Sequence, residues 1–304
     1  MEKKLQNPVV ICVLALFCCA LWGSAFPCIK IGYEWFEIED VGSQILFAGY
    51  RFFLSGVITF LVGCILEKGI LRIKGSSVPV ILRQGILQTA VQYLCFYIGL
   101  ANVTGTKGSI INASNAFVSI AAAHFMIKSE KMTWKKAVGC FLGVAGVVVI
   151  NMEKGAFGGG FQLMGEGMVL ISTIAYGIST VYLKMISDRE SPMAITSYQI
   201  LFGSTILIVC GVILGGHVDN FTVKSTLLLI YMALLSSVAF SIWTVLLKYN
   251  PVGKVAVYSF SIPVFGVIMS GIFLKEQFLS LKNAAALILV CGGIMIVNGK
   301  STGK

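Results

Sequence analysis

Charged residues are scarce in this sequence. Asp, Glu, Lys and Arg together make up 12% of the 304 residues, whereas 57% of the residues are hydrophobic. A water-soluble domain cannot cover that much apolar surface with so few polar groups, so a soluble fold is excluded. Only two histidines occur, which excludes a histidine-based catalytic cluster. With a mean hydropathy of +0.90, the expected solvent of the chain is the lipid bilayer.

Motifs for nucleotide binding and hydrolysis are also missing. No Walker, GxGxxG, HExxH or GxSxG pattern appears, and no stretch between apolar runs is long enough for a nucleotide-binding domain. The nine cysteines lie in apolar segments without CxxC or Cys/His spacing, which is typical of small buried side chains. We therefore expect no cofactor and no metal site, and we expect any transport to draw its energy from a gradient.

What the sequence does contain is a series of apolar runs. A hydrocarbon core of roughly 30 Å is crossed by roughly 20 helical residues, and runs of that length recur along the chain. They lack the alternation of barrel strands, so their backbone groups must be satisfied within helices. The sequence predicts an all-α integral membrane fold with ten transmembrane helices, at residues 8–30, 43–66, 80–101, 105–127, 134–152, 163–187, 192–214, 225–248, 253–274 and 281–298.

The net charge of +10 follows the connections between these spans. If the N-terminus is cytoplasmic, sixteen Lys and Arg residues fall on the cytoplasmic side and six on the outside, and Arg51 lies within a span. The positive-inside rule therefore predicts that both termini are cytoplasmic. The expected partner of the basic loops is anionic lipid rather than nucleic acid. A short chain without a transit peptide further predicts a bacterial plasma membrane as its location.

A glycine-rich stretch, GAFGGG at residues 155–160, divides the spans into five and five. We predict a first repeat at residues 1–154, a linker at 155–162 and a second repeat at 163–304. Because five is odd, the second repeat enters the membrane from the opposite side, and such inverted repeats suit alternating access. Four residues of the first half recur in order in the second, at offsets of 154 or 146: Trp22 as Tyr176, Gly23 as Gly177, Glu130 as Glu276 and Gly146 as Gly292.

The order of these short motifs resembles the drug/metabolite transporter superfamily, specifically its EamA-domain branch. The resemblance rests on WGSAF at residues 22–26, on YRFF around Arg51 and on the Glu-plus-Gly pattern that closes each half, and it covers nearly the whole chain. That branch often opens its second half with a Gly-Asp pair, where this chain has Gly165 and Glu166. The resemblance implies secondary transport, commonly export, of amino acids or other small metabolites along a path between the halves.

Polar side chains within the spans must face protein or a water-filled cavity, so stripes of them indicate a path. Gln84, Gln88 and Gln92 are spaced four apart in the third span, and Asn112 and Asn115 share a face of the fourth. We predict that Gln88, Gln92, Asn112 and Asn115 line the substrate path. The alternative is that these amides form hydrogen bonds between packed helices, each worth roughly 1 kcal/mol.

Arg51 lies eight residues into the second span, about 12 Å deep at 1.5 Å per residue. A guanidinium at this depth requires a partner, which could be helix-end carbonyls, the carboxylate of Glu166 or an anionic group of the substrate. The alternative role for Arg51 is a fixed clamp between helices. Four aromatic residues within the spans could gate a cavity or stack on a substrate, with core packing as the alternative: Trp22, Tyr176, Trp243 and Tyr258.

Other functions fit the sequence less well. An intramembrane enzyme would need His, Asp or Glu clustered at membrane depth, and a channel would need a ring of charges or a carbonyl filter. The polar stripes within the spans also argue against a non-transporting receptor or scaffold. Within transport, efflux of lipophilic cations is the alternative to carriage of amino acids. Small residues of the fifth and tenth spans permit close helix approach, either within the chain or in a homodimer: Gly139, Gly143, Gly146, Ala284, Ala285, Ala286, Gly292 and Gly293.

Overall fold

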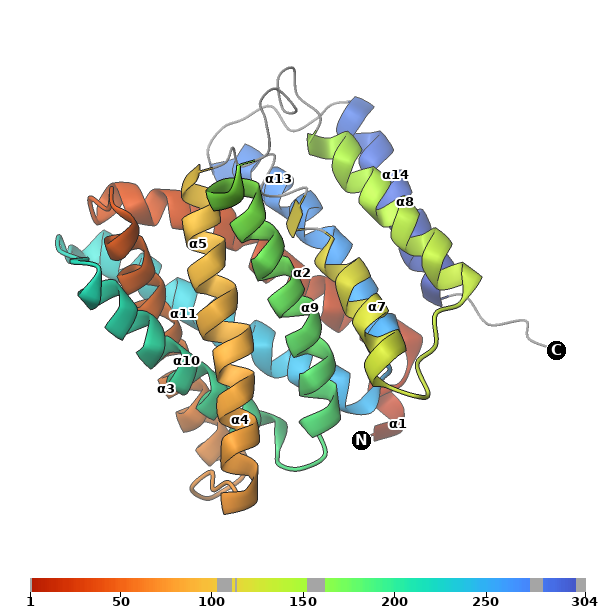
Figure 1. The fold of residues 1–304 in the computed structure, drawn as a ribbon, viewed down its shortest axis with the longest axis horizontal. Coiled ribbons are helices and arrows are strands. Elements are labelled where there is room, and N and C mark those ends of the chain that lie inside the picture. Colours follow the sequence, from red (N-terminus) through yellow and green to blue (C-terminus); the bar gives the residue numbers. More distant parts are fainter. Residues whose placement is uncertain (1, 103–110, 113, 152–161, 274–280, 299–304) are drawn as a thin grey trace.

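The computed structural model describes residues 2–102, 111–112, 114–151, 162–273 and 281–298. Within these ranges every regular element is a helix, and the helices pack side by side into a bundle (Figure 1). The predicted all-α class is therefore confirmed for the part of the chain that the structure describes. The predicted linker at 155–162 falls, except for its last residue, outside the described residues.

Six segments are long and apolar enough to cross a membrane. Four of them are single helices: α2 (Pro8–Trp35), α3 (Val41–Leu66), α10 (Pro192–Ile213) and α11 (Val223–Tyr249). The other two are composite: η3 (Leu163–Gly167) continues into α9 (Met168–Ile186), and α12 (Val252–Ala256) continues through η4 (Val257–Ser261) into α13 (Ile262–Phe273).

The remaining helices are shorter or interrupted. The predicted span at 80–101 consists of α4 (Val78–Gly85), a wider π-type segment η2 (Ile86–Val91) and α5 (Gln92–Asn102). The fourth predicted span is described only at residues 111–112 and 114–127, which include α7 (Asn115–Met126). The other described helices are α1 (Glu2–Leu5), η1 (Gly75–Ser77), α8 (Trp134–Asn151) and α14 (Leu281–Asn298).

Side-chain caps mark where several long helices begin. The carboxylate of Asp40 accepts hydrogen bonds from the backbone N–H and the hydroxyl of Ser43, and α3 starts at Val41, directly after Asp40. These hydrogen bonds, that of the hydroxyl first, lower the pKa of Asp40 below its usual range. At the start of α11, Thr222 and Ser225 form a reciprocal capping box. Local sequence therefore fixes these helix starts before any tertiary packing is considered.

Glycines allow two helix pairs to approach closely. In the pairing of α3 with α10, a Cβ added at Gly56 would lie 2.7 Å from the side chain of Leu201. In the pairing of α8 with α14, a Cβ at Gly139 would lie 2.8 Å from the carbonyl oxygen of Gly293. The pair α8 and α14 stands at one edge of the bundle (Figure 1). Gly139 and Gly293 thus pack within the chain, while a homodimer through the other small residues of these helices stays a prediction.

The remaining contacts place α2 and α9 at the centre of the bundle. Helix α2 packs against α11 and α13, and α9 packs against α5 and α7. Two clusters of buried apolar side chains fill the interior, one around Trp243 and Phe260 and the other around Phe47 and Phe52. Trp22 on α2 packs against both clusters. The two clusters therefore meet at α2, beside a cavity that Trp22 lines.

Candidate functional site

A cavity lies between the two halves of the bundle. About 610 Å³ of the space that it encloses and opens onto is free of protein atoms. Helices α2, α3, α5, α7, α9, α11 and α13 and the short segment 111–112 all contribute to it. The lining consists of Trp22, Ala25, Phe26, Ile29, Arg51, Gln92, Tyr93, Phe96, Asn112, Asn115, Tyr176, Phe240 and Ile262.

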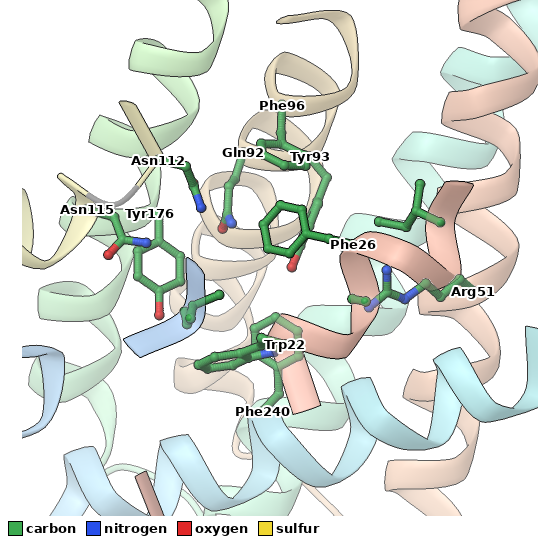
Figure 2. A pocket seen from close by; sticks show the side chains of 13 residues that line it. Trp22, Phe26, Arg51, Gln92, Tyr93, Phe96, Asn112, Asn115, Tyr176 and Phe240 are labelled. Carbon is green, nitrogen blue, oxygen red and sulfur yellow. The ribbon is translucent and has the colours of Figure 1, made fainter. Parts of the chain in front are cut away.

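Six of the nine residues predicted for the substrate path line this one cavity. Figure 2 shows Arg51 reaching in from α3 on one side, with Asn112, Asn115 and Tyr176 on the opposite side and aromatic rings between them. The six residues are Trp22, Arg51, Gln92, Asn112, Asn115 and Tyr176. They are far apart in sequence and come from both halves of the chain. The sequence patterns thus identified six side chains that the fold places around one cavity.

Arg51 is 3% exposed, and it is held by neutral groups of α11. Its Nε donates to the carbonyl oxygen of Met232 at 3.3 Å and to the hydroxyl of Ser236 at 3.1 Å, and its Nη2 donates to the same hydroxyl at 3.0 Å. The guanidinium carbon also lies 4.9 Å from the centre of the Phe52 ring, in cation–π contact. No carboxylate among the described residues forms an ion pair with Arg51.

The prediction that Glu166 could pair with Arg51 is wrong. One carboxylate oxygen of Glu166 accepts a hydrogen bond of 2.9 Å from the backbone N–H of Gln162, so this side chain caps η3 instead. The predicted helix-end carbonyls are also not the partners, because Met232 lies in the middle of α11. A carbonyl in mid-helix accepts a second hydrogen bond without losing its intrahelical one, since each carbonyl oxygen has two lone pairs.

Several polar atoms at the cavity are buried without a hydrogen-bond partner. Among the described residues these atoms include Nε1 of Trp22, Oε1 of Gln92, Oδ1 of Asn115 and the hydroxyl of Tyr176. Buried polar groups are nearly always hydrogen-bonded in folded proteins, and each exception requires an explanation. Of the twelve such atoms among the described residues, these four belong to residues that line the cavity, so a polar solute or water there would satisfy them together.

Aromatic rings form the apolar part of the lining. Trp22 packs edge-on against Phe240 with ring centres 5.5 Å apart, and Tyr93 packs against Phe52 at 4.3 Å. Sequence patterns did not indicate seven of the lining residues, because apolar residues and single aromatics occur throughout every span: Ala25, Phe26, Ile29, Tyr93, Phe96, Phe240 and Ile262. Only the position of Tyr93, next to Gln92, could have singled it out.

Three predicted residues do not line the cavity. Gln88 is 1% exposed and accepts a hydrogen bond from the amide of Gln84, so it belongs to a pair on α4 and η2. Trp243 lies behind Trp22, with ring centres 5.0 Å apart. Tyr258 is buried in η4, where its backbone carbonyl accepts a hydrogen bond from the thiol of Cys19. In each case the alternative of a packing role describes the observed position.

A second buried polar group lies where α9 and α11 end and α12 begins. Glu130 is 6% exposed, and its two carboxylate oxygens accept hydrogen bonds from the backbone N–H groups of Val252 at 2.8 Å and Gly253 at 3.1 Å. Nearby, Lys184 donates to the carbonyl oxygen of Lys248 at 2.9 Å. We call the contact of Glu130 with Val252 and Gly253 the Glu130 clamp; it ties the α7–α8 connection to the start of α12.

Comparison with known proteins agrees with this architecture. Residues 9–152 and 163–299 each match the EamA-like transporter family. An uncharacterized transporter of Bacillus subtilis, YetK, is 27% identical over 83% of this chain and 77% of its own length. A probable amino-acid metabolite efflux pump of Salmonella typhimurium is 23% identical over 92% of both chains.

A solved crystal structure of another protein has the same fold. It superposes with a TM-score of 0.78 at 17% sequence identity, covering 96% of this chain and 97% of the other. The family match spans almost all of the sequence, in the two halves that the glycine-rich stretch separates. With its long apolar helices, the protein is a multi-pass membrane protein and belongs to the EamA-like transporter family.

Proposed function

We propose that this protein is a secondary transporter of small metabolites that exports amino acids or related compounds by alternating access. The observation that carries the proposal is the cavity, which is lined by residues of both halves and holds buried polar atoms without partners. A site between two halves can open to either side in turn when the halves move against each other. The name of the Salmonella relative, an amino-acid metabolite efflux pump, supports the substrate class.

The proposed topology has ten membrane spans in two inverted repeats. Beyond the six long segments, the additional spans are residues 78–102, a span that ends in α7, and the 18-residue helices α8 and α14. The helix contacts support the repeats, because they are unchanged when the halves are exchanged. Helix α2 contacts α11 and α13 as α9 contacts α5 and α7, while α3 with α10 and α8 with α14 each pair with their own counterpart.

The proposed orientation places both termini in the cytoplasm of a bacterial cell, in the plasma membrane. Sixteen Lys and Arg residues then face the cytoplasm and six face outward, as positively charged cytoplasmic loops require. The Glu130 clamp lies on the cytoplasmic side in this orientation, since it joins helix ends close to the N-terminal helix α1.

Counterflow in proteoliposomes tests the proposal. Vesicles that contain the purified protein are loaded with unlabelled amino acids, and uptake of the same labelled amino acids is followed against protein-free vesicles. We expect transient accumulation of the label, which a Gln92→Ala variant reduces and a Gln88→Ala variant leaves in place. Absence of uptake of any amino acid by folded parent protein would contradict the proposal.

Efflux of lipophilic cations is a second candidate, and the aromatic lining favours it. The faces of Trp22, Phe26, Tyr93 and Phe240 could stack on a flat cationic compound. The fixed positive charge of Arg51 opposes it, because no lining residue is acidic. Counterflow of labelled tetraphenylphosphonium in the same vesicles separates the two candidates, and we expect no protein-dependent accumulation of this cation.

A further inference from the structure

We infer that the transported solute carries a carboxylate and that this carboxylate binds to Arg51. The inference rests on the proposed transport function and narrows the substrate class of the same cavity. Three features of the site support it: its charge balance, the donors that the guanidinium keeps for a ligand and the composition of the remaining lining.

The charge of Arg51 has no counter-charge in the structure. Its side chain is 3% exposed, and each of its hydrogen bonds goes to a neutral acceptor, the carbonyl of Met232 or the hydroxyl of Ser236. Ionised side chains at membrane depth normally pair with each other or face a water-filled path, because an isolated charge there is costly. None of the other residues that line the cavity is charged. The empty site therefore carries one positive charge that a negative group of a ligand would neutralise.

The guanidinium also keeps donors for a ligand. The hydrogen bonds to α11 come from Nε and Nη2, so Nη1 takes part in none of these, and the neutral hydroxyl of Tyr97 is a further neighbour of the guanidinium. Ser236 and Met232 thus hold one edge of the planar group in place, while the group itself lines the cavity. A carboxylate is the ligand that such a fork binds with two parallel hydrogen bonds, and phosphate is the other. Phosphate is less suitable here, because its second negative charge would have no partner in the lining.

The rest of the lining describes the remainder of the solute. Opposite Arg51, the amides of Gln92, Asn112 and Asn115 present polar atoms, two of which lack partners: Oε1 of Gln92 and Oδ1 of Asn115. These oxygens accept hydrogen bonds, as an ammonium or hydroxyl group of a solute would donate. Between the two polar ends lie aromatic and aliphatic side chains (Figure 2). The class is thus a monocarboxylate with an apolar body, and zwitterionic amino acids with apolar side chains fulfil each condition.

The competing explanation is that Arg51 is only a clamp between α3 and α11. A clamp predicts that substitution lowers stability and leaves the choice of solute unchanged. A carboxylate site predicts the reverse, a changed solute preference in a protein that still folds. Helix α10, which packs against α3, carries the fully buried neutral residue Gln199, so Arg51→Gln places in α3 a residue that its partner helix already tolerates.

The test is competition in the counterflow assay with a matched set of compounds. Labelled L-phenylalanine and L-leucine are the probes, and the competitors are the free acids, their α-amides and the deaminated acids 3-phenylpropanoate and 4-methylpentanoate. For the parent protein we expect both kinds of carboxylate to inhibit at concentrations at least tenfold lower than the amides. Inhibition by free amino acids only would show that the ammonium is required as well, and equal inhibition by the amides would overturn the inference.

Variants assign the preference to Arg51. We expect Arg51→Gln to abolish the preference for acids over amides and to raise the KM for the probes more than tenfold, with Arg51→Lys in between. The matched control is Arg83→Gln, the same change at an exposed arginine of α4 that is away from the cavity, and it should keep the parent preference. An Arg51→Gln variant with the parent preference would overturn the inference. Uptake of tetraphenylphosphonium or amides alone by the parent would overturn it while leaving transport intact, whereas no uptake of any compound would overturn both.

Discussion

Glu130 and Gln92 are both buried polar side chains, 6% and 8% exposed, but they differ in their partners. Each carboxylate oxygen of Glu130 accepts a backbone hydrogen bond from the start of α12. The Oε1 atom of Gln92 has no partner among the described residues, and the same is true of atoms of Trp22, Asn115 and Tyr176 around the cavity. The comparison separates two kinds of buried polar group: one stabilises the helix bundle, and the other, in our proposal, binds the solute.

The energetic consequence follows from the cost of an unmade hydrogen bond. A buried polar group without a partner destabilises a protein by roughly 1–3 kcal/mol, so four such atoms in one place are a substantial burden on the folded state. The Glu130 clamp carries no burden of this kind. Substitutions in the two regions should therefore affect different properties. At the clamp they should lower the free energy of unfolding, and at the cavity they should reduce transport.

Glu130→Ala gives the largest expected effect. The substitution leaves two backbone N–H groups of α12 buried without acceptors and removes a negative charge from a helix start, so we expect a loss of roughly 3 kcal/mol in unfolding free energy. Thermal unfolding of the detergent-solubilised protein measures it. Glu67→Ala, at an exposed carboxylate after α3, is the matched control. Equal melting temperatures for both variants would break the comparison.

Arg51→Met gives the next effect, on the cavity side. The hydroxyl of Ser236 also donates to the carbonyl of Met232 at 2.9 Å, so it keeps a partner when the guanidinium is removed. Replacing a buried charge by an apolar side chain of similar length is often neutral or stabilising, so we expect the unfolding free energy to fall by less than about 1 kcal/mol. Counterflow of amino acids should nevertheless drop more than tenfold. A strong loss of stability would instead identify Arg51 as a clamp.

Gln92→Leu and Gln88→Leu sharpen the comparison within one segment of the chain. Gln88 has a hydrogen-bond partner in Gln84, whereas Oε1 of Gln92 has none. We expect Gln88→Leu to lower the unfolding free energy by about 1 kcal/mol with unchanged transport. Gln92→Leu should leave stability within that margin and raise the KM for amino acids about fivefold, the equivalent of one hydrogen bond. The assignment of the cavity is contradicted if the two variants show the reverse pattern.

Asp40→Ala gives the smallest expected effect, at a fully partnered group outside the membrane. The loss of the cap on α3 should lower stability by about 0.5 kcal/mol, because the carboxylate is exposed. The lowered pKa of Asp40 means that the cap contributes fully above the unfolded pKa and is lost as the pH falls through the lower folded pKa. The melting temperatures of parent and Asp40→Ala should thus converge in acid, while Asp40→Asn, which keeps an acceptor, serves as the control. A difference that persists in acid would contradict the role of the cap.

The sequence predicted the helical class and much of the site, but it missed a local change in helix geometry. Apolar runs revealed the long helices, and polar residues within them revealed Arg51, Gln92 and Asn115. Equal spacing placed Gln88 with Gln92, since residues four apart share the face of a regular α-helix. Gln88 lies within the π-type segment η2, which ends just before Gln92 and holds extra residues per turn, so Gln88 is rotated away from the cavity. Nothing in the composition of Ile86–Val91 signals this widening.

The central claim is that the cavity opens to each side of the membrane in turn. Ala25, a small lining residue of α2, is changed to Cys in a variant from which the nine native cysteines have been removed and whose transport has been verified. The reaction of this cysteine with a membrane-impermeant maleimide is then followed in right-side-out and in inverted vesicles. The control is a Leu227→Cys variant, because the side chain of Leu227 in α11 is exposed on the surface of the protein and away from the cavity. We predict that Ala25→Cys reacts from both sides and that transported amino acids slow both reactions. Reaction from one side only, with or without amino acids, would contradict alternating access.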